Sequence, residues 1–282
     1  WILPLAVYLL TFMLVFGDDI WYERNMMAGL YAFLLFGVLA TQASGARLPT
    51  IGILITYLVL LFCGCMLCHG ELAKTKPAAD RLTIFYLALA LGGALGGVFV
   101  AIAAPYLFSG YWELPIVELL ALLVALSVTI FRKESLYYFR KKPLTTFSAL
   151  CVVIGMAAVQ QASVQKFYVD ATLVRRNLYG TLRVKEHDAG TELHRRELLN
   201  GSTLHGVQFL AEDKKHLATS YYGSSSGLGK VMATYSPEDK LHLGVVGLGT
   251  GNTAVYGDEN DRLAFFEIDA DVPFMLMVFQ IK

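Results

Sequence analysis

Six apolar runs occupy most of the first 165 residues and constrain this chain more than any other feature of its sequence. Each run is close to the ~20 residues that a helix needs to cross a ~30 Å hydrocarbon core. Because lipid offers the backbone no hydrogen bonds, such segments should be helices. The sequence therefore predicts an α-helical transmembrane bundle over residues 1–165, with about six spans at 1–16, 26–43, 50–68, 83–108, 115–131 and 144–164.

Composition supports this division of the chain. Only 16% of the residues are charged, whereas soluble proteins average about 25%. The first 165 residues hold ten Lys/Arg and eight Asp/Glu and the last 117 hold thirteen and fifteen, so charge density more than doubles after Gln165. The net charge of zero gives no electrostatic reason to expect a nucleic-acid partner. The partner that this composition favours is the lipid bilayer.

The polar part of the chain predicts two further regions. Residues 166–212 contain alternating stretches at 177–185 and 196–210, flanked by turn residues, as in a small antiparallel β subdomain. Residues 213–282 carry a strand, a glycine turn and a second strand, which is typical of the start of a Rossmann-like α/β domain. The predicted fold class is therefore multi-domain, with a transmembrane bundle followed by these two regions.

The glycine turn is the strongest chemical signal in the sequence. An apolar strand runs into Gly247, Gly249 and Gly251 and then toward a short helix. Glycines there permit a tight turn and let the backbone approach a ligand closely. The second strand ends in Glu267, eighteen residues after Gly249, the usual place for an acid that accepts the ribose hydroxyls of an adenosine ligand. A plain strand-to-helix turn without a ligand is the alternative.

Tyr221 and Tyr222 stand before a Gly/Ser loop at 223–227, shortly before the glycine turn. Paired tyrosines are most often packing residues. A loop that leads directly into a nucleotide-type site is also where a substrate wall is found. Both interpretations stay open, and the second makes these two tyrosines candidate substrate-loop residues.

Three features of the apolar part have competing interpretations. Cys65-Met-Leu-Cys68-His69 has the C-x-x-C-H spacing of haem attachment. It ends an apolar helix, where cysteines usually act as small packing residues, so we predict no haem, no metal and a helix cap at 69–71. Two overlapping G-x-x-x-G patterns at 92–97 predict close approach of another helix. Glu118 either snorkels toward water or is a functional intramembrane acid.

Several short motifs occur along the chain in one order. They are His69-Gly-Glu-Leu-Ala, Gly92-Gly-Ala-Leu-Gly-Gly, Asn200-Gly-Ser-Thr-Leu-His-Gly-Val-Gln, Gly244-Val-Val-Gly-Leu-Gly-Thr-Gly and Phe266-Glu-Ile-Asp. In this order the chain resembles the membrane-fused spermidine synthase-like proteins of bacteria, in which transporter-like helices precede a polyamine-synthase-type domain. The resemblance covers most of the chain.

The resemblance implies a class I S-adenosylmethionine fold and a transferase of polyamine biosynthesis in the bacterial inner membrane. The ligand would be S-adenosylmethionine or its decarboxylated form, and the reaction would be aminopropyl transfer to a small amine acceptor. Gly247, Gly249 and Gly251 would line the amino-acid or aminopropyl end of this ligand. Glu267 would hold the ribose, and Gln208 would lie near the ligand.

The sequence departs from the family pattern at two places. Thr250 stands where soluble spermidine synthases carry an acid, and Thr219-Ser-Tyr-Tyr-Gly replaces a Tyr-His-Glu type signature. The general-base Asp of the family is expected beyond Lys282, so the chain as given is expected to be incomplete as a catalyst. Two alternatives stay open: a transporter or membrane sensor with an adenosyl-metabolite-binding tail, and an S-adenosylmethionine-dependent methyltransferase.

The side of the membrane that the tail faces is a conflict within the sequence. The linkers after the first, third and fifth runs carry 1, 3 and 5 Lys/Arg, and those after the second and fourth carry 1 and 0. The positive-inside rule therefore places the tail away from the cytoplasm. S-adenosyl metabolites are made in the cytosol, so we nevertheless predict a cytosolic tail. Either a broken or re-entrant helix at the glycines of the fourth run or further helices before Trp1 would reconcile the two.

Overall fold

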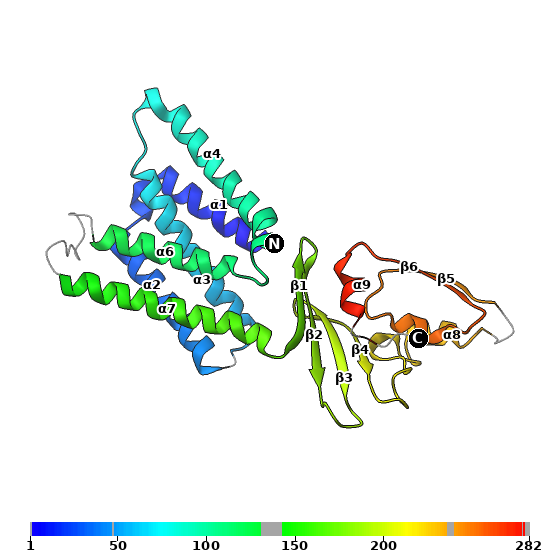
Figure 1. The fold of residues 1–282 in the computed structure, drawn as a ribbon. Helices are drawn as coiled ribbons and strands as arrows, with labels where there is room; N and C mark the ends of the chain where they lie inside the picture. Colours follow the sequence, from blue (N-terminus) through cyan, green and yellow to red (C-terminus); the bar gives the residue numbers. More distant parts are fainter. Residues whose placement is uncertain (1, 47, 131–142, 236–239, 278, 280–282) are drawn as a thin grey trace. The chain divides into compact units, whose positions relative to one another are not determined.

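The computed structural model describes residues 2–46, 48–130, 143–235, 240–277 and 279. The chain forms two compact units, one made of residues 1–98 and 111–165 and the other of residues 99–110 and 166–282. We call them the membrane unit and the tail unit (Figure 1). The basic linker at 131–142, which weighs most in the charge argument for orientation, lies outside the described residues.

Each predicted apolar run forms helix, and five helical segments are long and apolar enough to cross a bilayer. The helix α1 has only 16 residues, about 24 Å of helix, so it is shorter than a ~30 Å core. Five of the six predicted spans thus have the length expected in an integral membrane protein. The helices are α1 (Ile2–Gly17), α2 (Arg24–Ser44), α3 (Thr50–Ala73), α4 (Leu82–Val98), α5 (Ala104–Leu107), α6 (Glu113–Ile130) and α7 (Pro143–Val169).

The predicted break at the glycines of the fourth run is wrong. The helix α4 continues through 92–97, and the irregular segment is the π-helix Phe99–Ala103 that follows. An interior glycine costs a helix only about 1 kcal/mol relative to alanine. Pro105 instead removes an N–H and crowds the carbonyl of Ala101, four residues earlier, so the distortion falls there.

The close helix packing predicted for the same glycines is not found. A Cβ placed on any of the four glycines at 92, 93, 96 and 97 meets nothing within 4 Å. No residue of α4 is buried. Within the described chain, this small-residue stripe therefore has no helix against it.

The core of the membrane unit is built by α1, α2, α3 and α6: α1 and α2 pack against α3, and α6 packs against α2 and α3. Its largest fully buried side chains are Leu35 on α2, Met66 and Leu67 on α3, and Leu122 on α6. These helices are apolar on nearly all sides, so the residues that face lipid and those that face the core cannot be told apart by periodicity. Packing between helices selects the buried set.

A buried ion pair joins α2 to the last turn of α3. The Arg24 guanidinium donates to both Glu71 oxygens, at 2.6 and 3.0 Å, and the Tyr22 hydroxyl donates to Oε1 at 2.7 Å. The predicted cap at 69–71 is wrong, because α3 continues to Ala73 and its residues there serve contacts between helices. Gly70 lies under the Tyr22 ring, and a Cβ there would be 2.4 Å from ring carbons.

The first part of the tail unit is an antiparallel sheet in the order β1-β2-β3-β4, which confirms the predicted strand type. Its first strand was not predicted, because the stretch at 177–185 contains the β1–β2 turn and the second strand instead of one strand. Leu182, Val184 and Leu198 of the sheet pack against Val272 and the rest of α9 (Asp271–Leu276). The strands are β1 (Ala171–Asn177), β2 (Gly180–His187), β3 (Arg195–Asn200) and β4 (Thr203–Phe209).

The second part of the tail unit contains one parallel strand pair, β5 (His242–Val246) and β6 (Arg262–Phe266). The connection between them includes a 3-10 helix at Asn252–Tyr256, where a short helix was predicted. Residues after the Gly/Ser loop form the helix α8 (Gly227–Met232). In the described residues the parallel arrangement is limited to this pair, so the structure shows the strand direction expected of a Rossmann-like start without establishing that fold.

Candidate functional site

The glycine turn after β5 has the backbone conformation that its three glycines permit. Gly247, Gly249 and Gly251 have φ values of 91°, 55° and 69°, all in the region that side chains disfavour. The Gly247 N–H donates to the Phe266 carbonyl at 2.8 Å, which ties the turn to the end of β6. The sequence therefore needs glycine at these positions to reverse the chain directly after β5.

The turn packs against the antiparallel sheet through β4. A Cβ on Gly206 would lie 2.0 Å from Thr250 Oγ1, and a Cβ on Gly249 would lie 3.5 Å from the His205 carbonyl oxygen. Asn252 Nδ2 donates to the Val207 carbonyl at 3.3 Å. The absence of a side chain at 206 thus lets the glycine turn lie directly on the sheet.

Glu267 is fixed beside the turn by backbone amides. Its Oε2 accepts from the Leu248 N–H at 2.8 Å, and its Oε1 accepts from the Asp269 N–H at 2.9 Å. Each carboxylate oxygen has a second lone pair that can accept another hydrogen bond. The carboxylate is therefore oriented before any ligand arrives, with acceptor capacity left for two hydroxyl donors.

These residues border one cavity of about 310 Å³ within the tail unit. Four predicted site residues line it: Gly247, Gly249, Glu267 and Tyr222. Its size is at the lower end of the range for small-molecule sites. The other lining residues are Tyr179, Leu182, Leu198, Asn200, His205, Val246, Ile268, Asp269 and Val272.

Three predicted site residues are not among the described lining residues of this cavity. Gly251 shapes the turn by donating its N–H to the Leu248 carbonyl at 2.9 Å. Gln208 is buried on β4, with Nε2 3.4 Å from the Lys215 carbonyl oxygen. Tyr221 donates its hydroxyl to the His205 carbonyl at 2.9 Å.

The two tyrosines of the predicted substrate loop form one unit. Their rings are 4.4 Å apart between centroids. Burial, and next the hydrogen bond with Tyr221, raises the pKa of Tyr222 to about 12. The Tyr222 phenol therefore stays protonated at neutral pH and cannot act as a base.

Asp269 is the lining residue that sequence reasoning passed over. It is 4% exposed, and its Oδ1 accepts from Asn177 Nδ2 at 2.6 Å and from the Asp271 N–H at 2.9 Å. The motif Phe266-Glu-Ile-Asp contained it, and its position two residues after Glu267 was the available signal. Asn200 and His205 also reach the cavity, from a motif in which only Gln208 was selected.

The cavity combines acidic acceptors with an apolar wall. Glu267 and Asp269 are its acids, and no Lys or Arg occurs among its described lining residues. Such a lining disfavours phosphates and favours hydroxylated or cationic ligands. The described residues contain no group of three or more His, Cys, Asp and Glu placed to hold a metal ion.

Comparisons with protein families, curated proteins and solved structures find no match for this chain.

Proposed function

We propose that the tail unit binds the adenosyl moiety of S-adenosylmethionine or its decarboxylated form, in a membrane-bound, spermidine synthase-like transferase. The observation that carries the proposal is Glu267, held by two backbone amides at the glycine turn and bordering the 310 Å³ cavity. In this proposal β5 and β6 are the first strands of a Rossmann-like sheet. The ribose hydroxyls would donate to Glu267, whose remaining lone pairs suit them.

The charge of the cavity supports a sulfonium ligand. Both proposed ligands carry a positively charged sulfur and an ammonium group, and the decarboxylated form lacks the carboxylate that offsets one of these charges. Glu267 and Asp269 are the lining acids, and the described lining adds no cationic side chain that would repel the ligand. The Tyr222 phenol, protonated at neutral pH, adds a neutral side chain to this lining.

The proposed reaction is attack of an amine on the carbon bonded to the sulfonium. A new N–C bond forms as the C–S bond breaks, methylthioadenosine leaves with the bonding electron pair, and the amine loses a proton to a base. In this proposal the tail unit supplies the binding of the donor.

Calorimetric titration of the detergent-solubilised chain tests the proposal. Decarboxylated S-adenosylmethionine, S-adenosylmethionine and methylthioadenosine are the three probes. Glu267→Ala should weaken binding by roughly 1–3 kcal/mol, because charge-assisted hydrogen bonds are lost. Glu259→Ala is the matched control, since Glu259 is an exposed acid of the same unit outside the cavity.

Heat from none of the three probes would overturn the proposal. A clear preference for S-adenosylmethionine over its decarboxylated form would favour a methyltransferase over aminopropyl transfer. We further propose that the protein lies in the bacterial inner membrane with its tail in the cytosol, where S-adenosyl metabolites are made. A fluorescent-protein fusion after Gln165 should then fluoresce, and strong activity of an alkaline phosphatase fused there would contradict it.

A transporter or sensor is the second candidate function. One observation favours it: the membrane unit contains a buried carboxylate, Glu118, at a cavity of its own. Binding of an adenosyl probe by the intact protein without any turnover would favour this alternative over the transferase.

A further inference from the structure

A second cavity lies wholly within the membrane unit and has a volume of about 230 Å³. Its wall comes from α1, α2, α3 and α6, and it brings together the C-x-x-C-H residues and Glu118, which the sequence presented as separate features. Its lining includes Tyr8, Tyr31, Tyr57, Cys65, His69 and Glu118.

Glu118 is the acidic group of this cavity. It is 5% exposed, so the predicted snorkelling toward water is wrong, because neighbouring helices cover the side chain. Gln160 on α7 donates a hydrogen bond to Oε2, whereas Oε1 has no hydrogen-bond partner among the described residues. A buried carboxylate oxygen without a donor is costly in a low-dielectric setting. A ligand that supplies a donor or a positive charge would remove that cost.

Three tyrosine rings and an imidazole also line the cavity. The Tyr8 and His69 rings meet edge to face at 5.0 Å. The Tyr31 hydroxyl donates to the Glu118 backbone carbonyl at 2.9 Å, and His69 Nδ1 lies 3.1 Å from Thr11 Oγ1. These polar atoms already have hydrogen-bond partners, so the part of each residue left for a ligand is its ring. Aromatic rings beside a carboxylate are the surroundings that favour an organic ammonium.

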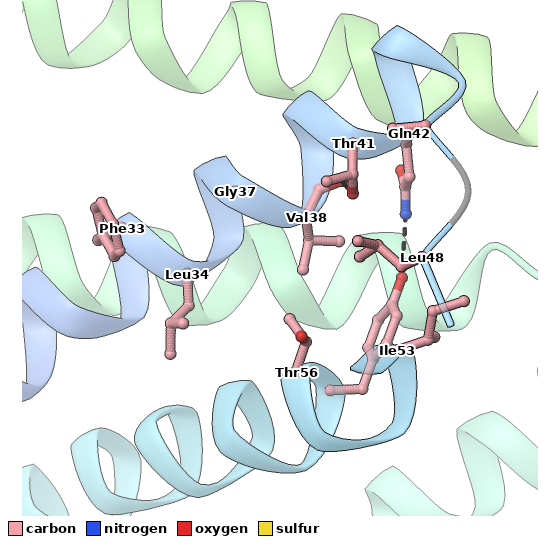
Figure 2. A pocket seen from close by; sticks show the side chains of 11 residues that line it. Phe33, Leu34, Gly37, Val38, Thr41, Gln42, Leu48, Ile53 and Thr56 are labelled. Atoms are coloured by element: carbon pink, nitrogen blue, oxygen red, sulfur yellow. Dashed lines mark hydrogen bonds between the residues drawn. The ribbon is translucent and has the colours of Figure 1, made fainter. Parts of the chain in front are cut away.

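A neighbouring cavity provides the contrast. It has a volume of about 370 Å³, is lined by residues of α2, α3 and the loop between them, and shares Tyr57 with the Glu118 cavity. Gln42 donates a hydrogen bond of 3.0 Å to the Tyr57 hydroxyl, and the dashed line from Gln42 in Figure 2 marks it. No acidic or basic side chain is among the described lining residues of this 370 Å³ cavity. The Tyr57 hydroxyl is thus engaged there, whereas the described lining of the other cavity contains the acid Glu118.

The chemistry of the lining selects the kind of cation. No Lys or Arg is among the described residues of the Glu118 cavity, so its carboxylate has no cationic neighbour there. Groups of three or more metal-ligating side chains are absent from the described chain, and a hydrocarbon and aromatic wall cannot replace the water shell of an inorganic ion. At about 230 Å³ the cavity is smaller than typical sites for drug-sized ligands.

We propose that this cavity binds a small aliphatic ammonium ion, with the ammonium group at Glu118 Oε1 and the alkyl chain against the tyrosine rings. The site is separate from the adenosyl site, since every residue that lines it belongs to the membrane unit. A negative result for one of the two sites would therefore leave the proposal for the other unchanged.

Calorimetric titration of the detergent-solubilised full chain with n-butylammonium chloride tests this site. The wild-type chain should bind saturably, and 1-butanol, which has the same alkyl chain without the charge, should bind roughly tenfold more weakly or worse. Glu118→Gln should weaken n-butylammonium binding by roughly tenfold or more, because the amide lacks the charge. Glu113→Gln is the matched control, an acid of the same helix outside the cavity.

Tyr8→Leu and Tyr57→Leu each remove one ring and keep Glu118. They therefore test ammonium binding even if Glu118→Gln does not fold. Each should weaken binding by about two- to thirtyfold, the range for a cation–π contact from exposed to desolvated. Glu267→Ala should leave this binding unchanged. Unaltered affinity in Glu118→Gln, unaltered affinity in both tyrosine variants, or stronger binding of K⁺ than of n-butylammonium would overturn the proposal.

Discussion

Glu118 of the membrane unit and Glu267 of the tail unit both border cavities, yet the chain holds them differently. Glu118 has one oxygen held by the side chain of Gln160, and its other oxygen has no partner among the described residues. Glu267 has both oxygens held by backbone N–H groups, from Leu248 and Asp269. The two units therefore use different donors for the same chemical group.

The difference follows from where backbone donors are free. In a helix interior each N–H is already bonded to a carbonyl four residues earlier, so a carboxylate among helices can recruit only side chains. A glycine turn directly after a strand leaves N–H groups that point away from any ladder. The tail can thus orient a carboxylate with local backbone, whereas the membrane unit depends on a residue 42 positions away.

The largest effect should come from a third carboxylate, Glu71, which is fully paired. Glu71→Ala removes two hydrogen bonds from the buried Arg24 guanidinium and should lower the free energy of unfolding by about 3–5 kcal/mol. Reversible denaturant unfolding in detergent, followed by circular dichroism, measures it. Glu118→Gln should cost far less, because it keeps the side chain's shape. A loss below about 1 kcal/mol for Glu71→Ala would contradict this prediction, because it is the size expected of a solvent-exposed ion pair.

A smaller effect should follow from filling the space where the glycine turn lies on β4. Gly206→Ala places a Cβ 2.0 Å from Thr250 Oγ1, and overpacking of this kind costs about 1–3 kcal/mol. Adenosyl-ligand binding should weaken with stability, because the turn must shift. Thermal unfolding and calorimetry of the same preparation measure both.

Gly93→Ala is the control for that substitution in the membrane unit. A Cβ at 93 meets nothing within 4 Å, so alanine should be neutral or should stabilise α4 by up to about 1 kcal/mol through helix propensity. A marked destabilisation by Gly93→Ala would mean that another helix packs on this stripe in the assembled protein.

The smallest effect is a pH dependence of stability that comes from Tyr222, a residue of the tail cavity. Burial raises the pKa of Tyr222 from 10.0 to about 12, so the folded state keeps this proton more tightly than the unfolded state. The resulting stabilisation is fully present below pH ~10 and is lost as pH rises through about 12. The difference in phenolate absorbance between the wild-type chain and Tyr222→Phe should show one tyrosine that titrates near pH 12. Titration of all tail tyrosines near pH 10 would contradict the burial of Tyr222.

Much of the helical part could be predicted because its signal is local. Every apolar run became a helix, and the predicted bounds of the second run, 26–43, differ from those of α2 by two residues or fewer. The error at the fourth run had a physical cause that the sequence also contained. Pro105 distorts a helix more than the glycines do, and weighing the two costs would have moved the irregularity to 99–103.

The tail cavity could be predicted only in part. Gly247, Gly249 and Glu267 come together because strand, turn and strand are consecutive, so their order along the chain fixes their neighbourhood. Gln208 was selected by resemblance alone, and its side chain lies on β4 outside the described lining of the cavity. Asp269 became a lining residue through contacts with Asn177, 92 positions earlier, which no local pattern signals.

The sequence by itself determined the apolar helices, the antiparallel strands and the glycine turn with its acid. Each of these depends on interactions within a few tens of residues, namely helix hydrogen bonds, strand alternation and turn conformation. Only the tertiary structure decided that Glu118 is covered and paired with Gln160, and that it shares a cavity with Tyr8 and His69. In helices that are apolar all round, periodicity cannot say which face turns inward, so packing between distant segments selects the neighbours.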